Sequence, residues 1–257
     1  MIDPRADIHP DAQIAPDVKI GPWTVIEAGV SIGTGTEVGA HVVIQGPTTI
    51  GAHNKIFQFS SIGAEPQDKK YSDETTLLEI GDRNVIREFV SINRGTVQGG
   101  GVTRIGDDNL FMAYSHIAHD CMIGNHTIMA NYSGLSGHVI LEDWVILGGF
   151  TGVHQFCTIG AHAFIGNDCK IRQDVLPYLM VAGGVDPKPY GLNAVGLRRR
   201  NFDDKTLVVL KKAYRVIFRQ DFSTEEMLAE LEKLLLESPA VGLMIEAIKK
   251  STRGFLR

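Results

Sequence analysis

Residues 8–62 read IHPDAQIAPDVKIGPWTVIEAGVSIGTGTEVGAHVVIQGPTTIGAHNKIFQFSSI, and an aliphatic residue occupies every sixth position of this stretch. The ten positions are Ile8, Ile14, Ile20, Ile26, Ile32, Val38, Ile44, Ile50, Ile56 and Ile62. A period of six matches neither the 3.6-residue period of a helix nor the alternation of a simple strand. It is typical of a parallel β-solenoid, in which each short strand turns one aliphatic side chain inward.

The same spacing continues beyond this stretch. It returns at Ile80, Ile86 and Ile92 and then runs from Ile105 to Ile171, which gives twenty-five hexads in all. If three hexads close one triangular coil, the chain builds about eight coils, stacked at roughly the 4.8 Å spacing of neighbouring strands. We therefore predict a mainly β protein, a parallel β-helix over residues 1–190.

Two segments interrupt the rhythm. Residues 64–79 contain the polar run EPQDKKY, and we expect them to project as a loop from an otherwise continuous coil. Ile92 and Ile105 are 13 residues apart, one more than two hexads, so we expect a tight loop or bulge near Gln98–Gly101. Loops on a rigid scaffold often carry binding groups, and we predict that role for the longer one.

Composition excludes several classes of protein. The 257 residues carry a formal net charge of -5, so no global positive field exists to hold nucleic acid or an anionic membrane. The N-terminus has no signal-peptide pattern and no apolar run is long enough to span a bilayer, which favours a cytoplasmic protein without membrane insertion. Cys121, Cys157 and Cys169 are widely spaced and are expected to be small buried side chains.

The C-terminal region follows a different pattern. Of the 28 glycines, 26 lie before residue 200, after which apolar residues take helical spacing. Ser223 to Glu226 form a capping-box sequence ahead of an apolar run, and a further short helix is expected over Val241–Lys250. We predict a helical domain over residues 191–257 that covers the open end of the solenoid.

Histidines gather on one side of the predicted coils. His119, His138 and His154 follow the inward positions 117, 135 and 153, which are 18 residues apart, so all three lie on neighbouring coils of one face. Asp120 is placed to orient His119 as a general base, and the N–H of Gly137 is open to an oxyanion. Three histidines on adjacent coils are equally typical of a zinc site of the carbonic-anhydrase kind.

Several segments resemble one family over essentially the whole chain. They are IGDRNVIRE (80–88), RGTVQGGG (94–101), HIAHDC (116–121), SGHV (136–139), VHQF (153–156) and STRG (251–254). Together they resemble the UDP-N-acetylglucosamine 3-O-acyltransferases, acyl-carrier-protein-dependent enzymes that open lipid A synthesis. The resemblance implies a left-handed β-helix, against the usual right-handed crossover, and a homotrimer with active sites between subunits.

The resemblance also assigns roles. His119 is implied as the base that deprotonates the sugar 3-hydroxyl, Asp120 as its orienting partner, and the Gly137 N–H as the oxyanion donor. No metal or permanently bound cofactor is implied, because phosphopantetheine arrives on the acyl carrier protein. The implied substrate-binding residues are Gln67, Asp68, Lys70, His116, His138, His154, Gln155, Asn193, Arg199 and Arg200.

Four features depart from the family pattern. Asn93 stands where a histidine is expected, Val195 replaces an acidic residue, and residues 184–187 read GVDP. Asn167 occupies a position where relatives carry glycine and where residue size acts as a ruler for the acyl chain. A larger, polar residue there predicts a shorter chain, about ten to twelve carbons rather than about fourteen.

Other functions remain open from sequence. A relative that uses a 3-amino sugar nucleotide would need the same base, and a coenzyme A-dependent acetyltransferase would use the same solenoid. The zinc protein predicts stoichiometric metal, whereas a noncatalytic trimeric scaffold predicts no turnover at all.

Overall fold

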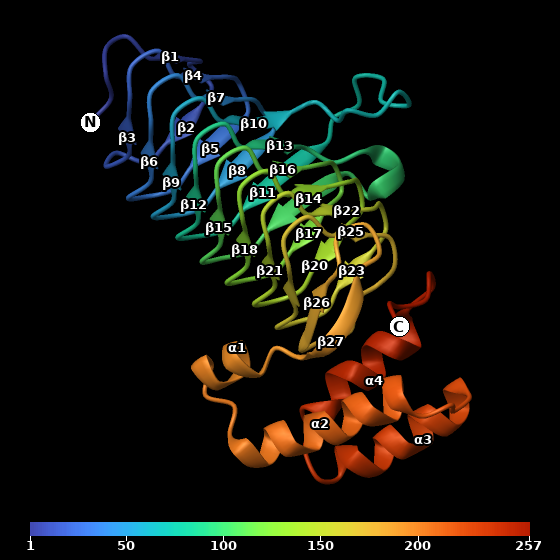
Figure 1. Ribbon diagram of the computed structural model, residues 1–257. Coiled ribbons are helices and arrows are strands. Elements are labelled where there is room, and N and C mark those ends of the chain that lie inside the picture. The colour runs from blue at the N-terminus through green and yellow to red at the C-terminus, as the bar shows by residue number, and fades with distance from the viewer.

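The computed structural model describes residues 1–257. Its short strands wind into a three-sided solenoid (Figure 1). The strands that form the coils end at, or contain, the predicted inward residues. Each side is one sheet whose strands are parallel apart from the last strand of the chain, and successive strands belong to successive sheets as far as Lys170–Ile171. Sheet I contains β1 (Asp7–Ile8), β4 (Val25–Ile26), β7 (Val43–Ile44), β10 (Ser61–Ala64), β13 (Ser91–Asn93), β16 (His116–Ile117), β19 (Gly134–Leu135), β22 (Gly152–Val153) and β25 (Lys170–Ile171).

The other two sheets are built in the same way. Sheet II contains β2 (Gln13–Ile14), β5 (Val30–Ile32), β8 (Thr48–Ile50), β11 (Leu77–Ile80), β14 (Val102–Ile105), β17 (Met122–Ile123), β20 (Ile140–Leu141) and β23 (Thr158–Ile159). Sheet III contains β3 (Lys19–Ile20), β6 (Glu37–Val38), β9 (Lys55–Ile56), β12 (Val85–Ile86), β15 (Leu110–Phe111), β18 (Ile128–Met129), β21 (Ile146–Leu147), β24 (Phe164–Ile165), β26 (Leu179–Ala182) and β27 (Lys188–Leu192).

Stacked inward side chains form the core. Of the hexad residues, all but Ile8 and Ile14 at the open N-terminal end are buried, and they belong to one apolar cluster that continues into the helices. The coils stack so closely that a Cβ on Gly33 would lie 2.7 Å from the backbone of Gly51, which explains the glycines after inward residues. The periodicity therefore predicted one core side chain per hexad, and further core residues such as Val18, Val42 and Val139 lie between the hexad positions.

The pairing register of the strands shows how many residues each of the two loops adds to its coil. Paired residues are 18 apart in unbroken coils, as for Ile26 and Ile44, but 30 apart for Ile62 and Ile92 and 25 apart for Ile92 and Ile117. The first loop therefore adds twelve residues to one coil and projects, as predicted. The second adds seven residues and forms a tight loop around the 3-10 turn Val97–Gly99, at the predicted place. Because position 98 is glutamine, it cannot supply the inward residue of a further hexad.

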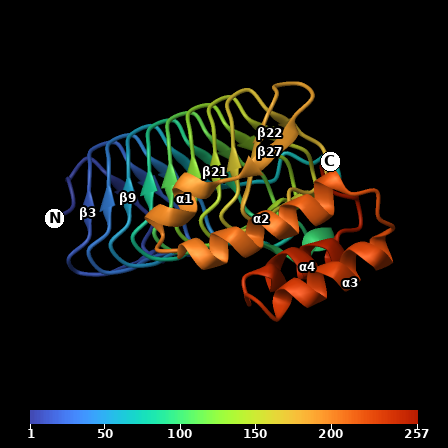
Figure 2. The ribbon, with the colours of Figure 1, turned by 60° about the horizontal axis from the view of Figure 1, so that its bottom comes forward.

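The C-terminal region consists of a hairpin and four helices. Strand β27 pairs antiparallel with β26, and the helices are α1 (Ala194–Arg199), α2 (Asp204–Arg219), α3 (Thr224–Leu235) and α4 (Val241–Lys250). The predicted capping box at Ser223 is present, and α4 has the predicted bounds. The hairpin and α1 were not predicted, and the boundary expected at residue 190 falls inside β27. The helices lie against the C-terminal end of the solenoid (Figure 2).

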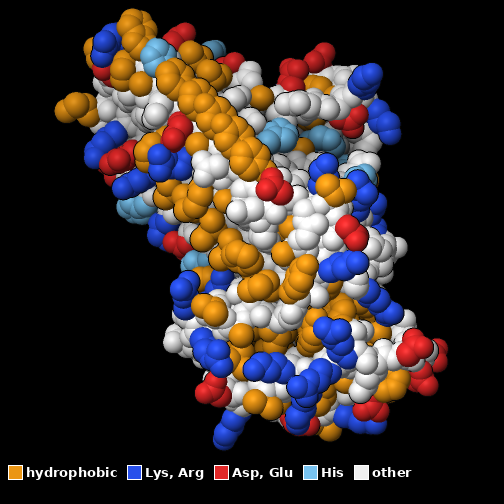
Figure 3. Space-filling view, in the orientation of Figure 1, with side chains coloured by type: hydrophobic (Ala, Val, Ile, Leu, Met, Phe, Trp, Pro, Cys, Tyr) orange, Lys and Arg blue, Asp and Glu red, His pale blue; other side chains and the backbone are white.

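An aromatic ladder follows the corner where the chain passes from sheet III to sheet I. It consists of Trp23, His41, Phe59, Phe89, Tyr114, Tyr132 and Phe150, whose neighbouring rings stack at centroid distances of 4.7–6.5 Å. All seven side chains are exposed, and a hydrophobic band crosses the β-helix in Figure 3.

All three cysteines are free and buried, and burial raises the pKa of Cys121 to about 12.

No helix in the structure combines the length and the apolar character that crossing a membrane requires.

Candidate active site

Five successive coils bring the candidate residues to one corner of the solenoid. At this corner, which we call the I–II corner, the chain leaves sheet I for sheet II after β10, β13, β16, β19 and β22. In that order it carries the long loop (64–76), the short loop (94–101), His119 with Asp120, Gly137 with His138, and His154 with Gln155.

His119 and Asp120 form a hydrogen-bonded pair. His119 Nδ1 lies 2.7 Å from Asp120 Oδ2, and the exposed fractions of the two side chains are 13% and 1%. A carboxylate oxygen accepts, so Nδ1 carries the proton and Nε2 keeps its lone pair. This is the tautomer that a histidine general base requires.

The short loop encloses the carboxylate of this pair. Thr96 donates to both carboxylate oxygens of Asp120, from its N–H at 2.8 Å and from its hydroxyl at 2.6 Å. Thr103 Oγ1 accepts from the Asp120 N–H at 2.8 Å. The sequence analysis assigned no role to Thr96 or Thr103, because these contacts exist only once the coils are stacked.

The next coil brings a backbone donor up to His119. A Cβ on residue 137 would lie 2.5 Å from His119 Cε1, so only glycine fits beside the imidazole. The Gly137 N–H donates no hydrogen bond within the chain. The neighbouring His138 ring meets His119 edge-on at 5.2 Å and stacks on Phe156 at 4.4 Å.

Burial lowers the pKa values of two further histidines, His138 and His116. It lowers the pKa of His138, and the Asp120 carboxylate, with His138 Nε2 at 3.7 Å from its Oδ2, opposes that shift. It also lowers the pKa of His116, which His119 lowers further. The Nδ1 atom of His116 shares a hydrogen bond of 2.8 Å with Ser91 Oγ. Burial therefore favours the neutral form of both imidazoles.

An open groove of about 520 Å³ runs along this face. Among the predicted residues it is lined by Gln67, His116, His119, Gly137 and His154. Lys170 and Arg172 also line it, and the sequence analysis missed both. Their only sequence signal is that they flank the last inward residue, Ile171, on the sheet that carries the histidines.

The remaining predicted residues lie outside the groove of their own chain. Asp68 accepts from the Lys70 N–H at 3.0 Å, and Lys70 and Gln155 are exposed. Asn193 caps α1, accepting from the Gly196 N–H and donating to the His162 carbonyl.

The arginines after α1 and the residue expected to measure the acyl chain also lie elsewhere. Arg199 is exposed, whereas Arg200 lies over the Trp144 ring at 5.0 Å. Asn167 is exposed at the aromatic corner, where its Oδ1 accepts from the Gly149 N–H at 3.1 Å. The roles of these residues stay predictions.

The side chains that could bind a metal ion are the His119–Asp120 pair and His138. One ligand atom from each of His119, Asp120 and His138 lies within 4.8 Å of the others, and His154 is not part of this group. The three-histidine arrangement expected of a zinc site is therefore not the one present, and Asp120 already accepts hydrogen bonds on both oxygens.

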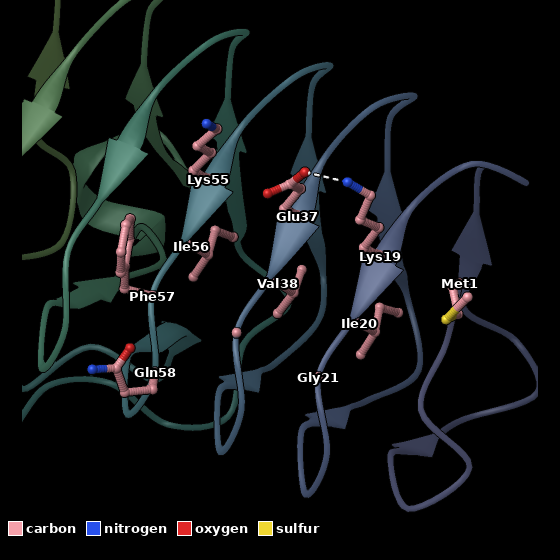
Figure 4. A pocket seen from close by; sticks show the side chains of 11 residues that line it. Met1, Lys19, Ile20, Gly21, Glu37, Val38, Lys55, Ile56, Phe57 and Gln58 are labelled. Atoms are coloured by element: carbon pink, nitrogen blue, oxygen red, sulfur yellow. Dashed lines mark hydrogen bonds and ion pairs between the residues drawn. The ribbon is translucent and has the colours of Figure 1, made fainter.

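A second groove lies on sheet III near the N-terminus (Figure 4). Its polar side chains are Lys19, Glu37, Lys55 and Gln58, and Lys19 is paired with Glu37 at 2.6 Å. It contains no histidine or cysteine, and we do not assign chemistry to it.

The β-helix and its histidine groove define a hexapeptide-repeat transferase. A family model described as bacterial transferase hexapeptide matches residues 11–46 and 103–137, and one described as UDP N-acetylglucosamine O-acyltransferase, domain 2, matches residues 174–256. The acyl-(acyl-carrier-protein)–UDP-N-acetylglucosamine O-acyltransferase of Pseudomonas paraeruginosa is 52% identical over 100% of this chain and 99% of its own length. That of Herminiimonas arsenicoxydans is 51% identical over the same shares.

Solved structures agree with these relatives. The UDP-N-acetylglucosamine O-acyltransferase of Moraxella catarrhalis is 44% identical, covers 100% of this chain and 99% of its own, and has a TM-score of 0.97. The Francisella novicida enzyme is 40% identical, covers 100% and 94%, and has the same TM-score. The chain belongs to the acyl-(acyl-carrier-protein)–UDP-N-acetylglucosamine O-acyltransferase family. The predicted left-handed β-helix with a helical C-terminal region is confirmed.

Proposed function

We propose that the protein transfers a 3-hydroxyacyl chain from acyl carrier protein to the 3-hydroxyl of UDP-N-acetylglucosamine, the opening step of lipid A synthesis. The observation that carries this proposal is the His119–Asp120 pair, which opens on a groove beside an unbonded Gly137 N–H. Family membership supplies the substrates, and the geometry supplies a base and an oxyanion donor for acyl transfer.

The reaction needs one proton acceptor and one oxyanion donor. His119 Nε2 takes the proton of the sugar 3-hydroxyl while the oxygen attacks the thioester carbonyl carbon. The Gly137 N–H stabilises the resulting oxyanion. The carbon–sulfur bond then breaks, the pantetheine thiolate leaves and takes the proton from His119, and the ester remains on the sugar. No acyl-enzyme forms.

We assign the sugar nucleotide to the groove and to the long loop beside it. Gln67 and His116 line the groove, and we propose that Asp68, Lys70, His138 and Gln155, which lie outside its lining, contact the same substrate. His154 lines the groove one coil beyond Gly137. Lys170 and Arg172 place two positive charges there, which suits the phosphate of either substrate.

A neighbouring chain would complete the site. Asn193, Arg199 and Arg200 lie away from the groove of their own chain, so we propose that a neighbour in a homotrimer supplies them. The exposed aromatic ladder supports an assembly, as do the outward apolar residues of sheet III. These are Val85, Leu110, Ile128, Ile146, Phe164 and Met180, one beside the next across six strands. Acyl carrier protein as donor favours a cytoplasmic location.

Incubation with UDP-N-acetylglucosamine and 3-hydroxyacyl carrier proteins of several chain lengths tests the proposal, with product masses read directly. His119→Ala should lower turnover by about 10²–10⁴-fold and leave the fold intact, because a corner imidazole adds little to the aliphatic core. A variant with more than about a tenth of wild-type turnover would remove His119 from the role of base.

The alternatives give different products. An amide would indicate a 3-amino sugar acceptor, turnover with acetyl-coenzyme A alone a coenzyme A enzyme, and loss of activity to chelators a zinc enzyme. Mixing inactive His119→Ala chains with inactive Lys70→Ala chains should restore activity if the two groups come from different subunits, whereas a fully active monomer would exclude a shared site.

A further inference from the structure

The burial of Asp120 is unusual for its place in the fold. Asp120 takes a left-handed backbone conformation with φ 61°, as do His138 and Phe156 at the equivalent corner positions of the next two coils. The exposed fraction is 1% for the Asp120 side chain but 21% for that of His138, and Phe156 as a whole is 51% exposed. The corner therefore does not bury Asp120, and the short loop does.

Thr96 makes the loop's polar contacts with this carboxylate. Its N–H donates to Oδ1 and its hydroxyl donates to Oδ2, the oxygen that also accepts from His119. The same hydroxyl accepts from the Gly99 N–H at 3.2 Å, which closes the short 3-10 helix Val97–Gly99. Thr96 is itself buried, with 1% of the residue exposed.

These bonds restrict the carboxylate in two ways. Donors on both oxygens fix its rotation about the Cβ–Cγ bond, and the hydroxyl bond keeps Oδ2 in line with His119 Nδ1. A threonine hydroxyl has one proton, so while it accepts from Gly99 that proton remains free for Asp120. The loop therefore presents the hydroxyl to Asp120 in one orientation.

We propose that Thr96 is a positioning residue for acyl transfer, acting through Asp120 to hold His119 in the tautomer and orientation of a base. The inference rests on the proposed role of the His119–Asp120 pair. Thr96 is buried and does not line the groove, so its effect belongs to turnover and not to substrate binding.

Thr96→Val tests this with little change in shape. The variant keeps the N–H bond to Oδ1 and loses the hydroxyl bond to Oδ2, so kcat should fall about 10- to 100-fold with the KM for UDP-N-acetylglucosamine unchanged. Thr96→Ser retains the hydroxyl and should restore kcat to within about threefold of the wild type. Equal losses in Val and Ser, or a change confined to KM, would overturn the proposal.

Two comparisons separate positioning from a structural defect. In an Asp120→Ala background, Thr96→Val should lower kcat by less than about twofold more, because its target is gone; a full additional loss would overturn the proposal. Thr127→Val removes another buried threonine hydroxyl, whose 2.8 Å bond goes to Asn109 Oδ1, and should keep wild-type kcat.

The two proposals fail differently. If His119→Ala stays active, the base assignment falls whatever Thr96 does. If His119→Ala is inactive while Thr96→Val, folded by circular dichroism, turns over at the wild-type rate, only the role of Thr96 is overturned.

Discussion

The two loops at the I–II corner break the same hexad pattern on consecutive coils, but they serve different halves of the site. The long loop is mostly exposed and sends Gln67 to the groove wall. The short loop turns inward and encloses Asp120. In the proposed function, one insertion therefore contacts the substrate groove, and the other holds the carboxylate that orients the proposed base.

The segment after β13 connects the two loops. Arg94 is buried, and its guanidinium donates to the Gly63 carbonyl at 2.8 Å and to the Tyr71 hydroxyl at 2.9 Å, at the foot and within the long loop. The Asn93 side chain donates to the Glu65 carbonyl at 2.8 Å. Thr96, two residues after Arg94, donates to the Asp120 carboxylate. Residues 93–96 therefore contact both the long loop and Asp120.

The largest effect should come from Gly99→Ala in the short loop. A Cβ there would lie 2.0 Å from Asp120 Cγ, so the carboxylate or the loop must move. We expect kcat to fall by about 100-fold or more, because a displacement of about 1 Å in the orienting group misaligns the base.

Gly100→Ala is the matched control. Nothing lies within 4 Å of its Cβ, but its φ is +95°, so the cost should be about 1 kcal/mol of stability with kcat retained. Thermal unfolding and steady-state kinetics measure both, and wild-type kcat in Gly99→Ala would show that the short loop does not control the base.

Arg94→Ala should act on the other half of the site. Without its bonds to Gly63 and Tyr71 the long loop loses its anchor, and we expect the KM for UDP-N-acetylglucosamine to rise about tenfold with kcat changed less. Tyr71→Phe removes only one of these bonds and should give a smaller rise. A fall in kcat alone would mean that Arg94 serves the base and that the two loops are not separate in function.

Sequence predicted the scaffold better than the site's supports. The hexads predicted the inward residues from Ile8 to Ile171, because the spacing of one aliphatic residue in six is a local pattern, but not Val181, which pairs with Ile165 and is buried. The hexad count predicted the place of the short loop but not its size, because thirteen residues fit two hexads plus one as readily as one hexad plus seven. Thr96 lies 24 residues from Asp120, and that contact depends on how distant segments stack. The cap that Asn193 makes with the Gly196 N–H is local, but the helix it caps was not predicted.

Acyl-chain length should depend on neither loop. Asn167 lies at the aromatic corner, away from both, and we propose that it closes the acyl groove in the assembled protein. Burying a terminal methyl against an amide loses volume and desolvates the amide, and each methylene contributes roughly 0.8 kcal/mol, or about fourfold in selectivity. Asn167→Gly should move the preference from about ten to twelve carbons toward about fourteen.

Acyl carrier proteins bearing ten-, twelve- and fourteen-carbon chains, supplied in competition, measure this preference. The Arg94→Ala variant should keep the wild-type order of chains. An unchanged order in Asn167→Gly would favour the role visible in one chain, a corner residue that bonds Gly149.

The smallest effect should be electrostatic and should link the long loop to the base's neighbour. Burial lowers the pKa of His138, and the Asp68 carboxylate in the long loop partly offsets the shift, as Asp120 does. Asp68→Asn removes that negative charge, so the pKa of His138 should fall further. His116 is an internal control, because its pKa is lowered by burial and by His119 without a contribution from Asp68. An NMR titration of the two imidazole Cε1–H signals reads both.

The same change has a defined sign in stability. A histidine whose pKa is lower in the folded than in the unfolded chain binds fewer protons when folded, so stability falls as pH drops below the unfolded value of about 6.5. The loss continues until the folded pKa is reached, and lowering that pKa in Asp68→Asn extends the window and deepens the loss. If the His138 titration does not respond to Asp68→Asn, the long loop acts on substrate alone, and the division between the two loops is sharper than the charges suggest.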